Sequence, residues 1–486
     1  MISYLKVKVT NSQFRGSIKE CNDSHLLSVD PSLLHHSSTR IYFNSKMSTK
    51  YSTIIEAQRV FFKTGGTRSI EKRKERLENL KRMIHENIER IAIAYEKDLG
   101  RGLKVAEMER SITLNRIDHQ INNLEEWSKP IELPLSPPLS TENGDSLYLV
   151  KESLGVVLNI APWNGPVTSL ASNMYAIAAG NTIVFKPSEM APSIASLWED
   201  IAPKYFEQNF FAVITGGVAE TTDLLKERFD HIFYTGSTAV AKIIMGAAAK
   251  NLTPVTLELG GKNPVFIDDS ADISHAVTQL LGGKQMGAGQ ICTCPDYILV
   301  TPKAKKEIVD EFKKRIAYLG ELNKNEFFGK IVHERAFDRL DSLIKSSKGA
   351  IVASSGTPDR SFLHYPLTIV EVPVDDSLMQ EELFGPIFPL HEVSSMEEAL
   401  EIIHSKEKPL AAYAFTSDSK IADRFVEDTW SGGVTINDVM VHTSSPLVPF
   451  GGVGHSGIGR IMGKYGFDTF THEKGVAMRK GTKLTL

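Results

Sequence analysis

The sequence predicts an α/β fold built on parallel sheets, and two observations carry that prediction. The short apolar runs NTIVF, FFAVI, HIFY, VTLEL and PVFI alternate with helical segments between residues 181 and 267, and similar alternation resumes from Tyr297 to about Thr435. Such runs are typical of parallel strands joined by crossover helices, because helices cover both faces of the sheet. The 486 residues, 42% hydrophobic and 23% charged, are enough for two or three domains with buried cores.

The composition excludes several classes of partner. Lys and Arg number 55 against 59 Asp and Glu, for a formal charge of -4. Nucleic acids and anionic membranes select an excess of basic residues, so we expect neither as the main partner. Three cysteines cannot form a disulfide framework in so long a chain. We therefore expect a reducing compartment and a cytoplasmic location, with a mitochondrial or membrane-peripheral location as alternatives.

No membrane-spanning segment is expected. The sequence contains no continuous apolar run of the roughly 18 to 20 residues that cross a bilayer. The chain ends in the polar run KGTKLTL, so no hydrophobic tail anchor is expected either.

Residues 1–46 differ from the rest of the chain. The segment is rich in Ser, His and Asn and has no sustained periodicity. Three interpretations remain open. The segment could be a disordered N-terminal extension, a weak organelle signal, or a stretch that precedes the true start of the protein at Met47. The acidic residues Glu20, Asp23 and Asp30 weigh against a transit peptide, which is acid-poor.

Helices and a hairpin are predicted between residues 67 and 160. Six apolar residues at spacings of 3, 4, 4, 3 and 4 form one helical stripe: Leu77, Leu80, Ile84, Ile88, Ile91 and Tyr95. Gly100 and Gly102 end that helix, and a second runs from about Val105 to Trp127. The prolines of IELPLSPPLS exclude a helix there. The β-rich run SLYLVKESLGVVLNI that follows predicts a hairpin.

Cys292 and Cys294 lie on the glycine-rich segment GAGQICTC. A cysteine is often a small buried hydrophobe, but here it could also be a thiolate nucleophile on a loop where the backbone approaches a substrate. The glycines on the N-terminal side favour Cys292 over Cys294. Two cysteines at this spacing are poor metal ligands alone, and no histidine motif completes them, so we expect no metal site.

Two further residues suit acid–base or oxyanion chemistry. Glu258 follows an apolar run and precedes Gly260 and Gly261, where burial would raise the pKa of the carboxyl and suit it to general-base work. Asn164 lies between a strand and a helix that begins near Pro166, and its amide could donate to an oxyanion. The alternatives are a turn carboxylate and an ordinary turn asparagine.

Two segments could bind a phosphate or a ribose. Gly236 and Ser237 follow a strand and open a helix, where exposed N–H groups bind phosphate, although Ser is also a common N-cap. Lys186 and Glu189 follow another strand, where α/β folds place ligand-binding groups, although they could form a solvated pair.

In order along the chain, the segments APWN, FKPSE, FYTGS, LELGGK, GQIC, EELFGP and PFGG resemble the aldehyde dehydrogenase superfamily. The resemblance covers roughly residues 50–478, and KPSE, CPDY and GKYGFDTFTHEKGV make it most similar to the class 3, or fatty aldehyde dehydrogenase, branch. It implies a Rossmann-like NAD(P)-binding domain (47–132 and 152–258), an α/β catalytic domain (259–440) and a small β oligomerisation arm. The arm would combine residues 133–151 with the C-terminal segment 441–486.

The resemblance also implies roles for the residues above. Cys292 matches the nucleophile, Glu258 the general base of deacylation and Asn164 the oxyanion-binding amide. The cofactor, NAD with NADP as an alternative, would be held by Lys186, Glu189, Gly236, Ser237, Glu382 and Phe384. The negative charge of Glu189 favours NAD over NADP.

The activity implied is NAD(P)-dependent oxidation of aldehydes, medium- or long-chain aliphatic or aromatic, to carboxylic acids through a cysteine thiohemiacetal and thioester. A CoA-acylating aldehyde dehydrogenase and a non-catalytic NAD-binding member remain alternatives, and Glu258 argues against the first because CoA transfer needs no water-activating base. A homodimer is expected. Two positions depart from the branch: Gly287 stands where Asn is frequent, and Ala241 where Gly is commoner, so its methyl group could crowd helix and sheet.

Overall fold

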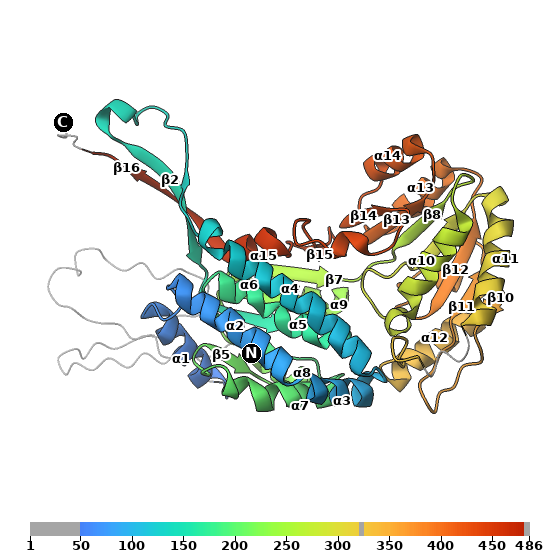
Figure 1. Ribbon diagram of the computed structural model, residues 1–486, viewed down its shortest axis with the longest axis horizontal. Coiled ribbons are helices and arrows are strands. Elements are labelled where there is room, and N and C mark those ends of the chain that lie inside the picture. The colour runs from blue at the N-terminus through green and yellow to red at the C-terminus, as the bar shows by residue number, and fades with distance from the viewer. Residues whose placement is uncertain (1–48, 320–324, 481–486) are drawn as a thin grey trace, which may run out of the picture. The chain divides into compact units, whose positions relative to one another are not determined.

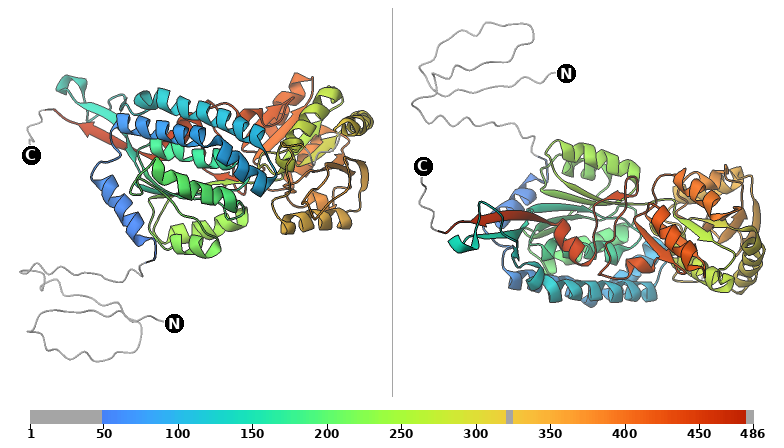
Figure 2. Two further views of the ribbon diagram at one scale, coloured as in Figure 1. Left: turned by 60° about the horizontal axis from the view of Figure 1, so that its bottom comes forward. Right: turned by 90° about the horizontal axis from the view of Figure 1, so that it is seen from above.

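The structure, a computed structural model, describes residues 49–319 and 325–480, which belong to one unit, Ser48–Leu486. The interpretations offered for residues 1–46 lie outside the described residues. Within the described residues the strands form sheets of six, seven and three strands (Figures 1 and 2). The mixture of parallel sheets and covering helices confirms the predicted α/β class.

The six-stranded sheet has the order β15-β7-β6-β3-β4-β5 and is parallel except for β15. Its strands are β3 Val156–Ile160, β4 Thr182–Lys186, β5 Phe211–Val213, β6 His231–Gly236, β7 Val255–Leu259 and β15 Gly457–Ile458. The chain runs from β3 outward to β5, then returns to β6 and β7 on the other side of β3. Ligands bind beside such a reversal, at the carboxyl ends of parallel strands.

Helices cover both faces of this sheet because its strands are apolar on both sides. Val157 and Phe185 pack with helices α2 to α7, whereas Leu158 and Val184 point to the opposite face and pack with α1, α8 and α9. The helices are α1 Ser52–Lys63, α2 Ile70–Glu86, α3 Ile88–Leu99, α4 Leu103–Trp127, α5 Pro166–Ala171, α6 Asn173–Ala178, α7 Pro192–Ile201, α8 Val218–Leu224 and α9 Thr238–Ala249.

The helical stripe predicted from Leu77 to Tyr95 is divided between two helices rather than one. The break is at Asn87, between α2 and α3. The Asn87 side-chain amide donates to the Met83 carbonyl at 2.9 Å and to the Tyr205 hydroxyl at 3.1 Å, so a local hydrogen bond ends α2. The predicted end at Gly100 is confirmed, since Gly100 caps α3 with a φ of 64°.

The hairpin predicted for residues 146–160 is wrong. The strand β2 (Ser146–Ser153) pairs antiparallel with β1 (Ile131–Glu132) and β16 (Thr471–Met478) in the three-stranded sheet, while β3 pairs with β4 and β6. Gly155, with a φ of 137°, turns the chain out of one sheet and into the other. A Cβ atom there would lie 2.3 Å from the Asp230 carboxylate, so the turn requires glycine.

The seven-stranded sheet has the order β10-β11-β12-β9-β8-β13-β14, and β10 is its antiparallel edge. Its strands are β8 Pro264–Ile267, β9 Tyr297–Val300, β10 Ala350–Ser354, β11 Thr368–Glu371, β12 Ile387–Glu392, β13 Ala411–Phe415 and β14 Gly433–Ile436. The remaining helices are α10 Ile273–Gln285, α11 Pro302–Tyr318, α12 Glu334–Ser346, α13 Met396–His404, α14 Ser419–Asp428 and α15 Gly463–Thr469.

The passage from β7 to β8 joins the two large sheets. Only four residues separate these strands, and Gly261 lies where a Cβ atom would be 2.8 Å from the Leu410 backbone nitrogen. Glu258, at the end of β7, is therefore fixed beside the start of the second sheet.

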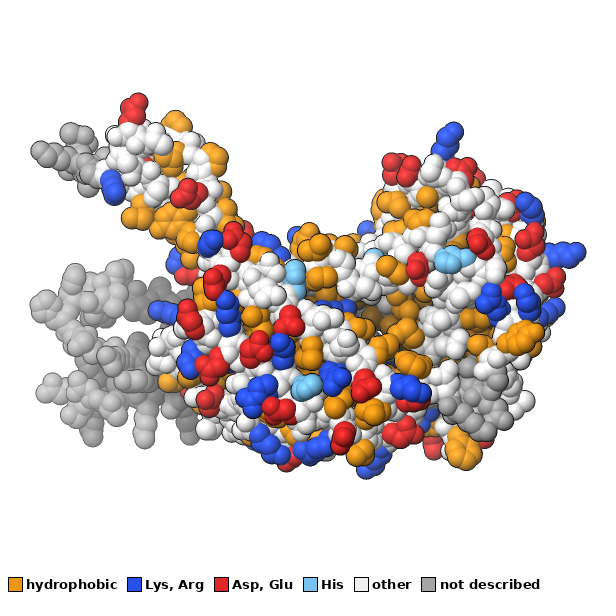
Figure 3. All heavy atoms as spheres, in the orientation of Figure 1, with side chains coloured by type: hydrophobic (Ala, Val, Ile, Leu, Met, Phe, Trp, Pro, Cys, Tyr) orange, Lys and Arg blue, Asp and Glu red, His pale blue; other side chains and the backbone are white. Residues whose placement is uncertain are grey.

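On the face shown in Figure 3, acidic and basic side chains intermingle over α2 and α4. Lys74 and Lys81 of α2 pair with Glu125 and Asp118 of α4, both at 2.5 Å. Among residues 49–319 and 325–480, no helix combines the length and the apolarity that crossing a bilayer demands.

Asn181 is expected to be important for stability. It is fully buried, accepts from the Gly155 backbone at 2.9 Å and donates to the carbonyls of Ala176 and Phe470 at 3.2 and 3.0 Å. Replacing Asn181 by Ala leaves these groups unpaired, so we expect a loss of about 3 kcal/mol in unfolding free energy, measured by thermal or denaturant unfolding. The exposed Thr222→Ala variant should change it by less than about 0.5 kcal/mol. Equal effects of the two substitutions would contradict this assignment.

Candidate active site

Three side chains predicted from separate segments line one cavity of about 290 Å³. Asn164 comes from the loop between β3 and α5, Glu258 from β7 and Cys292 from the loop between α10 and β9. The cavity thus lies where the carboxyl ends of the cofactor-side strands meet the second sheet.

The loop that carries Cys292 has an uncommon backbone. Gly287, Ala288 and Gly289 follow one another in the left-handed region, with φ of 63°, 53° and 72°. A Cβ atom at Gly289 would lie 2.5 Å from the Gly385 carbonyl oxygen, so that position requires glycine. Ala288 is fully buried and carries the strain of a left-handed residue, roughly 1 to 2 kcal/mol.

Side-chain amides, one from outside the loop and one from within it, hold this loop. The Asn263 amide donates to the carbonyls of Cys292 and Cys294 at 2.8 and 2.9 Å. The Gln290 amide donates to the carbonyls of Gly287 and Lys330 at 2.9 and 3.0 Å. Asn263 is not among the residues predicted from the sequence. The sequence pattern that could have pointed to Asn263 is a polar residue directly before the apolar run PVFI of β8.

The thiol of Cys292 is held in its protonated form. Burial raises its pKa to about 12, and the carboxyl groups of Glu258 and Glu382 add to the rise. Cys294 does not line the cavity: its Sγ lies 3.8 Å from the Gly283 carbonyl, and burial raises its pKa to about 11. Of the two cysteines, only Cys292 lines the cavity, and its role as nucleophile stays a prediction.

The carboxyl group of Glu258 is buried without a hydrogen bond that would offset the loss of water. Only 3% of the residue is exposed, and neither carboxyl oxygen has a hydrogen-bond partner among the described residues. Burial raises its pKa well above the ordinary value. A carboxylate formed here is a stronger base than one in water, as general-base work needs.

Asn164, on the loop after β3, is hydrogen-bonded to the loop that carries Cys292. Its side-chain amide donates to the backbone carbonyl of Gln290 at 2.9 Å. The backbone carbonyl of Asn164 accepts from the Arg101 guanidinium at 2.8 Å. A primary amide has two donor hydrogens, so one bond to Gln290 leaves the second for a group in the cavity.

Four of the predicted cofactor residues lie at the carboxyl ends of β4 and β6. Lys186 is 2% exposed, and its Nζ lies 2.7 Å from Glu189 Oε2. Gly236 ends β6, and Ser237 caps the twelve-residue helix α9, accepting from the Val240 backbone at 3.5 Å. A Cβ atom at Gly236 would lie 2.2 Å from the Tyr234 hydroxyl, so any side chain there would have to displace the Tyr234 ring.

Ala241, the first departure, lies buried in the apolar cluster between α9 and the sheet. There its methyl group packs with Ile244 and Leu257, and α9 remains regular. The crowding expected from this methyl group is not seen.

Glu382 and Phe384 lie on the loop before β12. Burial, followed by the charge of Asp296, raises the pKa of Glu382 to about 8. A Cβ atom at Gly260 would lie 2.2 Å from Glu382 Oε2, so the glycine lets the carboxyl approach β7. Phe384 has a φ of 47°, and its ring meets that of Trp163 edge-on at 5.9 Å.

Three charged residues that the sequence analysis missed fix this loop. Lys262 pairs with Asp296 at 2.6 Å, and the other Asp296 oxygen accepts from the Leu383 backbone at 2.8 Å. Arg339 donates to the carbonyls of Glu382 and Leu383. These contacts join segments up to 87 residues apart, and no local pattern marks them.

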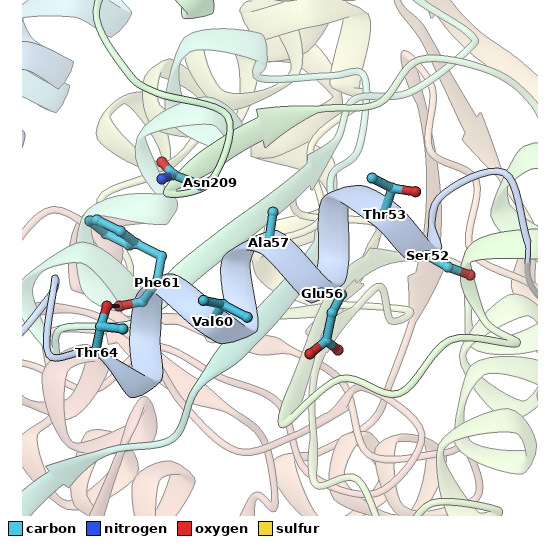
Figure 4. Close-up of a pocket in the computed structure, with 8 residues that line it drawn as sticks. All are labelled: Ser52, Thr53, Glu56, Ala57, Val60, Phe61, Thr64 and Asn209. Atoms are coloured by element: carbon cyan, nitrogen blue, oxygen red, sulfur yellow. Dashed lines mark hydrogen bonds between the residues drawn. The ribbon is translucent and has the colours of Figure 1, made fainter.

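A second hollow contains none of the predicted residues. It lies along α1, extends from Ser52 to Thr64, and has Asn209 on its other side (Figure 4). Glu56 is its only charged lining residue, and the hollow is open to solvent, so nothing about it resembles a catalytic centre.

Comparisons with known proteins show the family to which the chain belongs. The sequence profile described as "Aldehyde dehydrogenase family" matches residues 22–476, beginning within the segment 1–46. The chain is 44% identical to the rat protein "Aldehyde dehydrogenase, dimeric NADP-preferring", over 87% of this chain and 93% of that one. It is 42% identical to mouse "Aldehyde dehydrogenase family 3 member A2", over 87% of each. A solved structure of a Staphylococcus aureus AldH in its substrate-bound state superposes with a TM-score of 0.86 and 37% identity, over 90% of this chain and 96% of that one.

The raised pKa of Cys292 predicts slow alkylation by iodoacetamide at neutral pH. Because only the thiolate reacts, the rate should rise about tenfold per pH unit from pH 7 to pH 9 without a plateau. Mass spectrometry of the peptide that contains Cys292 measures this rate, and a Cys292→Ala variant identifies reaction elsewhere. A plateau below pH 8 would show that the thiol ionises far more readily than its burial indicates.

Proposed function

The chain belongs to the aldehyde dehydrogenase family, and from that premise we propose how its cavity works. As a member of the family it is an NAD(P)-dependent enzyme that oxidises aldehydes. The observation that supports a mechanism most strongly is that Cys292, Glu258 and Asn164 line the same cavity.

The residues at the strand ends fit a dinucleotide. The first N–H groups of α9 have no acceptor within the helix and suit a pyrophosphate, which the close turn at Gly236 lets approach. Lys186 and Glu189 suit the adenosine ribose, and the buried Glu382 with Phe384 suits the nicotinamide ribose. When bound, the nicotinamide supplies the acceptor for the hydride that leaves the substrate.

Catalysis begins with the sulfur of Cys292. The thiol gives up its proton to water, the thiolate attacks the aldehyde carbon, and the carbonyl oxygen gains negative charge. The free N–H of the Asn164 amide stabilises that oxyanion, a contribution of about 3 kcal/mol for one donor. Loss of hydride from the resulting thiohemiacetal leaves a thioester on Cys292.

Glu258 then removes the acyl group. Its carboxylate takes a proton from a water molecule, which attacks the thioester and releases the carboxylic acid. The raised pKa makes Glu258 an effective base once ionised.

The proposed substrates are medium- or long-chain aliphatic aldehydes and aromatic aldehydes. Apolar side chains line much of the cavity, among them Met108, Ile112, Met174, Phe327 and Phe450. Such walls contribute roughly 25 cal/mol per Å² of apolar substrate surface that they cover. They therefore favour larger apolar aldehydes over small ones.

The proposed assembly is a homodimer formed through the three-stranded sheet. β2 and β16 lie side by side (Figure 1), and most residues of β16 are exposed. An exposed strand edge without a core of its own is best covered by a second copy, and the rat relative is named as dimeric. The cytoplasmic location expected from the sequence stays a prediction.

Glu258→Gln should trap the acyl-enzyme. The amide cannot take a proton from water, so hydrolysis should slow by about 100-fold or more while acylation continues. We expect one NADH per site in a burst and a mass increase equal to the acyl group on Cys292. In the parent enzyme, kcat should rise with pH as Glu258 ionises. Cys292→Ala is the control and should give neither NADH nor adduct.

Absence of an accumulated thioester in Glu258→Gln would exclude Glu258 from deacylation. A faster release of acyl groups when CoA is added, with acyl-CoA as the product, would instead favour the CoA-acylating alternative.

Glu189 should set the preference for NAD over NADP. Its carboxylate repels a 2′-phosphate, so Glu189→Gln should raise the ratio of kcat/KM for NADP to that for NAD by about tenfold. The exposed Glu125→Gln of α4, which removes the same charge elsewhere, is the matched control and should leave the ratio unchanged. A parent enzyme that prefers NADP and a variant with the same ratio would together refute this role.

A further inference from the structure

A buried arginine joins the two loops that carry Asn164 and Cys292. Arg101 follows the helix cap at Gly100 and is 3% exposed. Its guanidinium donates to the carbonyl of Asn164 at 2.8 Å through Nη1 and to that of Gly287 at 3.4 Å through Nη2. One planar group thus spans the loop after β3 and the loop after α10.

The loop after α10 is shaped to receive this side chain. A Cβ atom at Gly287 would lie 2.2 Å from Arg101 Nη2, so the guanidinium occupies the space that a side chain at 287 would need. Gly329 likewise leaves room for the aliphatic part of the Arg101 side chain, since a Cβ atom there would lie 2.8 Å from Arg101 Cγ. Both glycines have left-handed φ, 63° and 68°, which glycine adopts without strain.

The charge of Arg101 is balanced within the same buried network. Glu109 of α4 favours the charged guanidinium, and Arg101 in turn favours the Glu109 carboxylate against burial. Glu109 accepts from the Tyr95 hydroxyl at 2.8 Å and from the Thr168 backbone at 3.3 Å. The network therefore also holds the first turn of α5, which follows Asn164.

We propose that Arg101 is a positioning residue that fixes the Asn164 amide relative to the Cys292 loop, so that both act on one substrate carbonyl. The inference rests on the proposed function of Asn164 and Cys292. Arg101 acts through the two carbonyls that it binds. Displacing a catalytic donor by about 1 Å can reduce a rate by about 100-fold.

The test compares Arg101→Met and Arg101→Lys with the parent full-length enzyme. Three rates are measured: aldehyde oxidation, cofactor-free hydrolysis of p-nitrophenyl acetate, and alkylation of Cys292 by iodoacetamide. We expect kcat for the first two reactions to fall by about 10- to 100-fold in Arg101→Met, with KM little changed. Alkylation, which needs no oxyanion donor, should stay within about twofold. Arg101→Lys keeps one donor and should recover part of the loss.

Arg73→Met is the matched control. Arg73 also donates to two backbone carbonyls, those of Thr67 and Ala178, and also lies against a left-handed glycine, Gly180, but outside the cavity. Its replacement should lower the melting temperature and leave kcat of the folded enzyme unchanged. If Arg101→Met behaves the same way, Arg101 has only a structural role.

A double-mutant cycle with Asn164→Ala separates the inference from the proposed function. If Arg101 acts through Asn164, Arg101→Met should lower kcat by less than about twofold in the Asn164→Ala background. Losses that multiply would overturn the inference and leave the proposed function standing. An Asn164→Ala enzyme with full activity would refute the proposed oxyanion role itself. If Arg101→Met does not fold, Arg101→Met/Glu109→Gln removes the unpaired buried charge and carries the same comparison.

Discussion

The chemistry of this site depends on one electrostatic constraint: a charge on Cys292 or on Glu258 makes it harder for the other group to ionise. The buried Glu258 and the partly buried Cys292 line one cavity, and the carboxyl of Glu258 is among the causes that raise the pKa of the thiol. A thiolate and a carboxylate therefore oppose each other's ionisation there. In the proposed mechanism the two ionised forms are needed at different steps: the thiolate attacks while Glu258 is neutral, and the thioester that forms carries no charge. Because the acylated sulfur can no longer ionise, ionisation of Glu258 would then no longer be opposed by a thiolate beside it.

This alternation requires that neither group moves, and the fold secures them differently. Glu258 belongs to β7, whose backbone pairs with β6 and β15 on its two sides, so the strand itself fixes it. Cys292 follows three left-handed residues and has no strand to hold it. The side-chain amide of Asn263 donates to the Cys292 carbonyl. Side-chain hydrogen bonds therefore fix the position of this loop, whereas hydrogen bonds to neighbouring strands fix that of β7. Loss of such an amide would displace the nucleophile without unfolding the sheet.

The sequence predicted what depends on local patterns and missed what depends on long-range pairing. Apolar runs identified β4 to β8 because these strands are covered on both faces and read the same in any sheet. The hairpin at residues 146–160 failed because β2 and β3 look alike locally, and only their partners, far along the chain, place them in different sheets. Ordered motifs identified Cys292, Glu258 and Asn164. Arg101 was missed because its bonds reach residues 63 and 186 positions away.

One arrangement of glycines and charged side chains recurs in this structure. It explains why a single residue that departs from a family's sequence pattern does not by itself indicate a change in the structure. At several places a buried or half-buried charged side chain lies against a glycine whose Cβ atom would collide with it: Glu382 at Gly260, Asp230 at Gly155, Arg73 at Gly180 and Arg101 at Gly287. In each case the missing side chain and the distant charge occupy the same volume, so the two positions cannot change independently. Gly287 stands where Asn is frequent in the class 3 branch, so the loop that carries Cys292 lacks the amide of that residue. With Arg101 in that space, the support comes from another segment, and the identity of residue 287 has to be judged together with that of residue 101.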